Sequence, residues 1–310
     1  MSTSVPATRR ALVAVALAAV AALAGACVPA PPGTSTTTTT AAPGTVRAIT
    51  GATLEWTISR EADSASFAPG QVNYWSAGQS DSTSATYAAT NGNATVLKQN
   101  ASGAYVPIGS ESSVSWANRN RNGAGTVVTT ANGLRLGQKV RLSQGTGTVN
   151  TATGAATIQW TGTFSVNFYG QYVPFWIVNP KLIVSAGGAA KLTATLGGFA
   201  SSLDNPDVRT PLAPTANVVL ADLANAWSGG SVATGFTSAT KYLGTTVTTP
   251  AEAPQVLKTT ANSSYWGSWP QSFVNFQNGT GLGTYWYSSG GAADAKKPQD
   301  PVSVSYTLGA

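Results

Sequence analysis

Residues 161–197 read TGTFSVNFYGQYVPFWIVNPKLIVSAGGAAKLTATLG, and this stretch decides the fold class. Apolar and polar residues alternate over 164–169 and again over 192–196, as they do along antiparallel strands that turn one face to a core. Between these runs, Asn179-Pro180 predicts a corner. The unbroken apolar run at 182–184 predicts a segment buried on both faces. We therefore expect a series of antiparallel strands.

The same alternation recurs outside this stretch, at residues 54–58 and 156–160. A turn at 151–154 with glycine in its last position predicts a β-hairpin, and residues 131–133 give a second hairpin signal. Helical patterns are few. The strongest covers residues 270–277, which begin with proline, and Gly279 is expected to close it. The predicted fold is an all-β, antiparallel β-sandwich with one or two short helices.

The N-terminus has the pattern of an export signal over residues 1–26. Arg9-Arg10 precede an apolar run that is too short to cross a membrane comfortably. Two interpretations of its end remain open. Residues 24–26 fit a cleavage site, which would release a secreted protein, and the same residues before Cys27 resemble a lipobox, which would anchor the chain through a lipid on Cys27. We favour lipidation because Cys27 is the only cysteine.

After Cys27 the chain is rich in proline and threonine, so residues 27–46 are interpreted as the lipid-anchor cysteine and an extended tether. Residues 47–310 are long enough for a β-sandwich domain. The signal holds two of the 17 basic residues and none of the 11 acidic ones, which leaves a mild positive charge and predicts no nucleic-acid partner. The densest basic cluster is interpreted as solvated strand faces rather than a contact for an anionic polymer or haem propionates; it comprises Arg119, Arg121, Arg135, Lys139 and Arg141.

The available chemistry argues against catalysis. The chain has no histidine, which excludes Ser-His-Asp and Cys-His catalysis and histidine-ligated metal sites. No pair of carboxylates stands in a recognisable catalytic setting, although Glu55, Glu61 and Asp63 lie close together in sequence and Asp204 and Asp207 share a loop. We expect a binding protein without a metal site, not an enzyme.

Aromatic residues supply the remaining chemistry, with nine Trp and ten Tyr in the chain. Because neighbouring residues of a strand point to opposite faces, each aromatic cluster must place some rings outside the core. Exposed rings could stack on a porphyrin or on the faces of sugars. The clusters are Tyr74-Trp75; Tyr169, Tyr172, Phe175 and Trp176; and Tyr265, Trp266, Trp269, Tyr285, Trp286 and Tyr287.

The order of these blocks over residues 50–308 resembles the HtaA-type domain, a haem-transport-associated module of actinobacterial cell surfaces. The resemblance rests on the 161–197 stretch and on three shorter matches. These are the Tyr-x-x-Gly step at 287–290, the Asp300-Pro301 pair before an alternating terminal strand, and Leu54-Glu55-Trp56 near the domain start.

The resemblance implies haem as the cofactor, and it implies where haem would bind. A tyrosine shortly after the first tryptophan would ligate iron, but Ala65 stands at about that position. Gln171 stands where a histidine would support the ligand, and Tyr287 matches a late pocket tyrosine. Tyr169, Tyr172 and Tyr74 are the other tyrosines that could reach iron.

Three functional hypotheses follow for an exported, extracellular protein at the cell surface, either lipid-anchored or secreted. The first is haem binding or relay in iron acquisition, with haem-uptake components as partners. The second is a haem-free module that interacts with envelope glycans, with Trp286 and Tyr287 as a candidate aromatic platform. The third is a purely structural wall protein.

Overall fold

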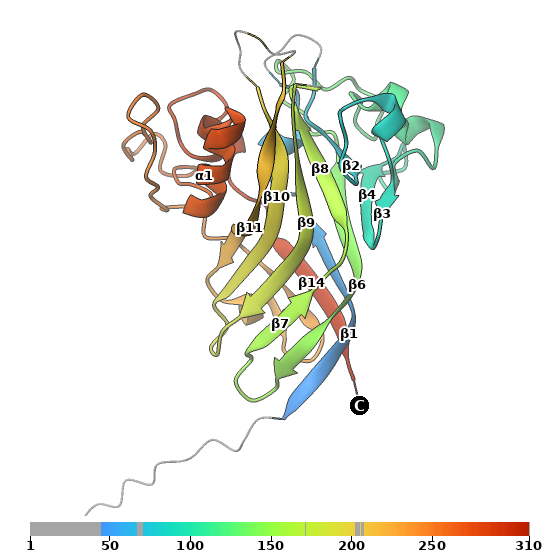
Figure 1. Ribbon diagram of the computed structural model, residues 1–310, viewed down its shortest axis with the longest axis vertical. Coiled ribbons are helices and arrows are strands. Elements are labelled where there is room, and N and C mark those ends of the chain that lie inside the picture. Colours follow the sequence, from blue (N-terminus) through green and yellow to red (C-terminus); the bar gives the residue numbers. More distant parts are fainter. Residues whose placement is uncertain (1–44, 67–70, 171, 202–204, 206–207, 310) are drawn as a thin grey trace, which may run out of the picture. The chain divides into compact units, whose positions relative to one another are not determined.

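In the computed structural model, the described residues are 45–66, 71–170, 172–201, 205 and 208–309. They form mainly strands, which belong to one connected antiparallel sheet (Figure 1). The long strands are β1 Val46–Trp56, β6 Gln138–Asn150, β9 Val173–Val184, β10 Ala190–Ala200 and β11 Thr210–Leu223. The shorter ones are β2 Tyr74–Ala77, β3 Thr90–Asn91, β4 Ala94–Gln99, β5 Tyr105–Pro107, β7 Ala156–Gln159, β8 Thr163–Phe168, β12 Gly230–Ser231, β13 Gly235–Ser238 and β14 Val302–Leu308.

The sheet curls so that its two ends approach each other. Its main path runs β11-β10-β9-β7-β6-β1-β14-β13-β12, with β8 and β2 branching from β9, and β4 from β6. The chain just after β13 meets β11 again, because Leu223 forms a bridge with Thr240. The Gln299 amide also donates to the Leu220 carbonyl at 2.6 Å. The all-β, antiparallel class is confirmed, and the facing layers of the sandwich are parts of one sheet.

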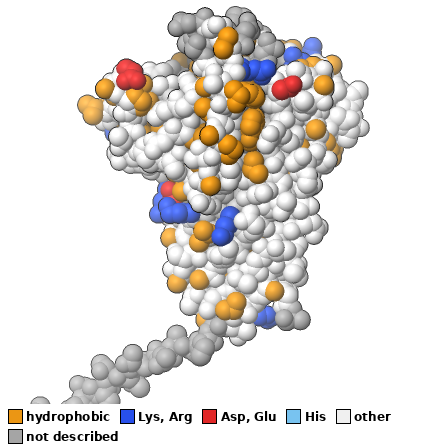
Figure 2. Space-filling model, in the orientation of Figure 1, with side chains coloured by type: hydrophobic (Ala, Val, Ile, Leu, Met, Phe, Trp, Pro, Cys, Tyr) orange, Lys and Arg blue, Asp and Glu red, His pale blue; other side chains and the backbone are white. Residues whose placement is uncertain are grey.

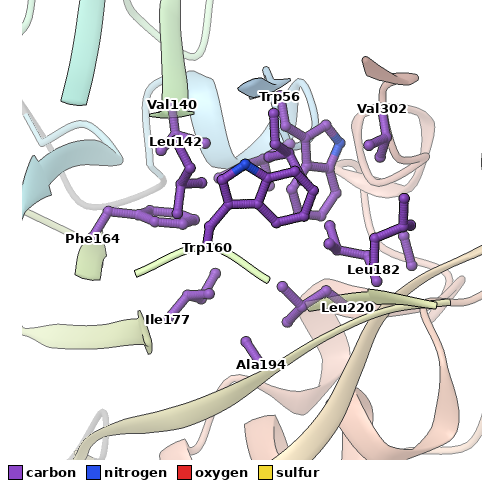
Figure 3. Close-up of a cluster of buried hydrophobic side chains, with 14 of the residues drawn as sticks. Trp56, Val140, Leu142, Trp160, Phe164, Ile177, Leu182, Ala194, Leu220 and Val302 are labelled. Atoms are coloured by element: carbon purple, nitrogen blue, oxygen red, sulfur yellow. The ribbon is translucent and has the colours of Figure 1, made fainter. Parts of the chain in front are cut away.

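The core lies between these layers and is centred on Trp160, at the end of β7 (Figure 3). Side chains from strands far apart in the strand order lie around its indole, among them Leu220 of β11 and Val302 of β14. The indole N–H donates to the Ala52 carbonyl at 2.9 Å, which satisfies the one polar atom of this buried side chain. The predicted stripes at 54–58 and 156–160 both supply core residues.

Three local predictions from the sequence need correction. Asn179-Pro180 does not end a strand, because β9 continues through it as a bulge with Asn179 in the left-handed region at φ 48°. The 182–184 run is not buried on both faces, since Ile183 is 44% exposed. Residues 131–133 form a turn, but no pair of strands flanks it. The hairpin predicted at 151–154 is confirmed between β6 and β7.

Among the described residues the single α-helix is α1 (Gln271–Thr280), the one that Pro270 predicts. It continues through Gly279 to Thr280 because Gly281, not Gly279, takes the left-handed conformation that ends it, at φ 87°. Short 3₁₀ turns complete the structure: η1 Glu61–Asp63, η2 Ser84–Thr86, η3 Ser112–Val114, η4 Trp116–Asn118, η5 Ala226–Gly229, η6 Gly283–Trp286 and η7 Asp294–Lys296. Within the described part of the chain, none of these helices has the length and apolar character needed to cross a membrane.

Candidate functional site

Tyr287, the late pocket tyrosine implied by the resemblance, is fully buried in the core. Its hydroxyl donates to the Ala253 carbonyl at 2.5 Å, and burial raises the pKa of this phenol above its usual value. Trp286 beside it is 1% exposed and packs edge-on against Trp269 and Phe273. The hypothesis that Trp286 and Tyr287 form an exposed platform is therefore wrong, because both rings lie inside the molecule.

Tyr74 is also buried, on the other side of β2 from Trp75. Its ring lies 5.9 Å from Tyr87 and 5.4 Å from Trp116, edge to face in both cases, within a small second core. Burial raises its pKa to about 12, so the phenol stays protonated at neutral pH. Tyr74 is 1% exposed, so its ring is enclosed by protein and offers no open face to a ligand.

Tyr169 and Tyr172, the other tyrosines considered for haem, follow β8 in the chain. Tyr169 has a left-handed backbone at φ 54°, and its half-buried ring contacts Tyr285 at 5.6 Å. Tyr172 is half-buried against the main core. Ala65 is buried, and Gln171 lies outside the described residues. Among the described rings, no contact joins any two of Tyr74, Tyr169, Tyr172 and Tyr287, so the structure does not gather them into one pocket.

The basic cluster is occupied within the fold. Arg135 pairs with Asp63 at 2.9 Å and with Asp300 at 2.6 Å. Lys139 and Arg141 both pair with Glu55, at 3.0 and 2.6 Å. The two other cations also have partners, since Arg119 lies over the Trp116 ring and Arg121 donates to the Gly125 carbonyl. These contacts favour the structural interpretation of the cluster.

A different aromatic group lies on the outer face of the sheet, and we call it the Trp176 platform: Trp176, Gly197 and Phe199. Trp176 of β9 pairs across the ladder with Gly197 of β10, and its indole covers that glycine. A Cβ atom at Gly197 would lie 2.2 Å from the indole nitrogen, so only glycine allows this approach. The Phe199 ring meets Trp176 edge to face at 5.6 Å. Both aromatic side chains are only partly buried.

Next to this platform, two bulges hollow the same face. Asn179 on β9 and Asn217 on β11 both adopt left-handed backbones, at φ 48° and 57°. The ladders of β10 with its two neighbours shift register at these points, between Thr193 and Leu196. Because a bulge bends its strand away from the regular surface, the pair opens a groove of about 280 Å³ over the middle of β10.

Hydroxyl and amide groups line this β10 groove, with Thr193 and Thr195 along its floor and Asn179 and Asn217 at its sides. Groove and platform are continuous, because Thr193, Thr195 and Gly197 follow one another on the same face of β10. In Figure 2 hydrophobic side chains gather over the upper parts of β9 and β10, with a basic and an acidic side chain at the upper edge of this patch and further basic side chains below it.

Charge differs between the two ends of this surface. At the groove end, Lys181 is the one charged residue among the described lining residues. At the platform end, Arg209 lies 5.4 Å from the Phe199 ring and donates to the Asp81 carbonyl at 2.9 Å. Hydrogen bonds from Thr86 and Thr83 lower the pKa of Asp81, so its carboxylate is ionised beside Arg209. The groove end is therefore the more positive.

A larger hollow of about 710 Å³ lies over β1, β14 and β13 on another part of the sheet. Hydroxyl side chains and the Glu55–Arg141 ion pair line it. Its one aromatic residue, Phe236, is buried beneath Trp227 and offers no open ring face. It therefore has polar groups but no surface on which a ring could stack. Among the described residues, no group of acidic residues is placed to hold a metal ion.

Alternation predicted an exposed ring within the aromatic cluster at 169–176, without saying which ring it is. Phe175 and Trp176 are adjacent on a strand, so one of them had to point outward. Gly197 continues the outward series of Thr193 and Thr195, and a glycine at such a position often marks a close approach. The pairing of Trp176 with Gly197 could not be foreseen, because it depends on the ladder register.

No protein-family model matches this sequence, and no curated protein matches it. Among solved structures, the chain is similar to the C-terminal domain of HtaA from Corynebacterium glutamicum, with 14% sequence identity. The match covers 85% of this chain and 99% of that domain, with a TM-score of 0.39. This is the family that the sequence resembles.

Proposed function

We propose that this protein is an exported cell-surface module that binds a glycan along the Trp176 platform and the β10 groove. One observation carries the proposal: a tryptophan that lies over a strand glycine continues directly into a groove of hydroxyl and amide side chains. The C–H groups on one face of a sugar ring pack favourably on the negative face of an aromatic ring, while its hydroxyls need hydrogen-bonding partners. Platform and groove supply these two kinds of contact side by side.

Two polar groups of the groove are available for a ligand. The Thr195 hydroxyl and the Asn217 side chain make no hydrogen bond with another described residue, and Asn217 is exposed. From Thr193 to Gly197 the β10 surface extends over about 14 Å at the usual rise per strand residue. That length exceeds a single sugar ring, which favours an oligosaccharide segment as the ligand.

The same proposal places the module at the cell surface by means of the N-terminal segment. The export signal, Cys27 and the tether lie outside the described residues, so they enter as sequence predictions. A lipid on Cys27 and a proline- and threonine-rich tether would hold the domain at a distance from the membrane, within reach of envelope polysaccharides.

The test is binding of the purified domain, residues 45–310, to an array of microbial envelope and plant polysaccharides. We expect Trp176→Ala to weaken binding about ten- to a hundredfold, because a stacking aromatic ring typically dominates such a contact. Gly197→Ala should cause a similar loss, since its methyl group would displace the indole. Trp227→Ala and Gly291→Ala are the matched controls, at a half-buried tryptophan and an unstrained glycine elsewhere.

Two results would overturn the proposal. One is that no polysaccharide is retained, and the other is that Trp176→Ala binds as tightly as the wild type. Haem binding is measured in parallel, as a Soret shift with added haemin. If haem bound and Tyr169→Phe or Tyr172→Phe removed the shift while no glycan bound, the haem function implied by the resemblance would replace the proposed one.

A further inference from the structure

The charge of the β10 groove bears on which glycan it accepts. Lys181 of β9 lines the groove, and none of the described lining residues is acidic. Across the ladders it is paired with Gln159 of β7 and Thr193 of β10, both uncharged. No ion pair joins Lys181 to another described residue.

The neighbouring lysine on the same face differs. Lys191 lies on β10 two residues before Thr193, which stands opposite Lys181. Lys191 pairs with Asp222 at 2.8 Å. Its charge is therefore balanced within the protein, and Lys139 and Arg141 share the carboxylate of Glu55. Lys181 keeps an unbalanced positive charge at a place where hydrogen-bonding groups converge, and such a charge favours an anionic group in a ligand.

From these observations we infer that the glycan is acidic, with an anionic group at Lys181 while a sugar ring of the same chain stacks on Trp176. This inference rests on the proposed function. Lys181 stands level with Thr193, and Trp176 stands level with Gly197, so the two contacts are about 14 Å apart along the strand. The anionic group and the stacked ring then belong to different sugar units of one extended chain.

Lysine presents a compact charge that contacts a carboxylate and a phosphate equally well. Either group would be an anionic substituent on a sugar, and an experiment decides whether it is a carboxylate or a phosphate. Three probes separate the cases: a neutral glucan hexasaccharide, hexagalacturonic acid, and a mannose oligomer linked through phosphodiesters.

The experiment measures the affinity of wild type, Lys181→Gln, Trp176→Ala and Lys258→Gln for each probe by calorimetry. Lys258 is an exposed lysine on a loop and serves as the control for loss of one charge. We expect Lys181→Gln to lose about tenfold affinity for one or both acidic probes, as loss of a charge-assisted contact does, with no change for the neutral one. Wild-type binding of the acidic probe should weaken with added salt.

The two proposals fail in different ways. If Lys181→Gln and Lys258→Gln bind every probe like the wild type while Trp176→Ala does not, the inference about charge is overturned and glycan binding stands. The same holds if the neutral probe binds as tightly as the acidic ones. If Trp176→Ala binds all probes like the wild type, both proposals are overturned.

Discussion

At the scale of single residues, burial separates side chains that the sequence presents as equivalent. Trp176 and Trp286 each stand next to another aromatic residue in a strand-like or turn-rich segment. In the fold Trp176 is partly exposed over Gly197, whereas Trp286 is enclosed by Trp269 and Phe273. Alternation predicts that one of two neighbours points outward, but which face of a strand becomes the outer one depends on contacts distant in sequence.

Glu61 is a residue whose protonation should affect stability. Its carboxyl is 3% exposed, and burial raises its pKa from 4.5 to about 7, although Lys296 and Lys297 act in the opposite direction. Because the folded state holds this proton more tightly than the unfolded state, the free energy of unfolding should fall as pH rises from about 4.5 to 7.

We expect Glu61→Gln, which resembles the protonated carboxyl, to lack this decrease. The difference in unfolding free energy between wild type and variant should change by about 1–3 kcal/mol across this pH range. Urea unfolding at several pH values measures it. If plots of unfolding free energy against pH stayed parallel for wild type and variant between pH 4.5 and 7, Glu61 would not titrate in this way.

At the scale of elements, most strands followed from alternation, and helix α1 followed from Pro270 and its apolar spacing. The Asn179-Pro180 pair was misjudged because the same residues suit a corner and a bulge. Asparagine tolerates the left-handed backbone. β9 continues because β10 pairs with it on both sides of the bulge, while β8 pairs with the residues before the bulge and β7 with those after it. The groove depends on this bulge, so it could not be predicted from the strand pattern.

The bulge in β9 gives a prediction about Asn179. Asn179→Val should destabilise the domain by about 1–2 kcal/mol relative to Asn179→Gly, because a β-branched residue is strained at φ 48° whereas glycine is not. Both variants lose the hydrogen bond that the Asn179 side chain accepts from the Gly162 N–H, so their comparison isolates the backbone. Urea unfolding measures the difference, and equal stabilities would contradict a strained bulge.

At the scale of the whole molecule, the sequence indicated the all-β class but not how the sheet closes. Leu220 and Val302 both belong to the buried cluster around Trp160 because β11 and the chain around β13 come together. Such contacts join residues far apart in the chain, and local patterns do not contain them. The same closure defines which surface is outer, and so places Trp176, Thr195 and Lys181 on one accessible face.

The central claim is that a glycan binds at this outer face, and the nine tryptophans of the chain offer a direct test. Six of their indoles are buried, and only Trp116, Trp176 and Trp227 are partly exposed, in three different parts of the sequence. Nitrogen-15 NMR spectra of the domain resolve the indole N–H signals. Substituting each of these three tryptophans in turn assigns its signal, because that signal disappears from the spectrum.

On titration with hexagalacturonic acid, and separately with the neutral glucan hexasaccharide, we predict that the Trp176 indole signal shifts with at least one of the two. The signals of Trp116 and Trp227 should stay in place and serve as internal controls. A Trp176 signal that does not move with either hexasaccharide, or a shift confined to Trp116 or Trp227, would contradict the claim.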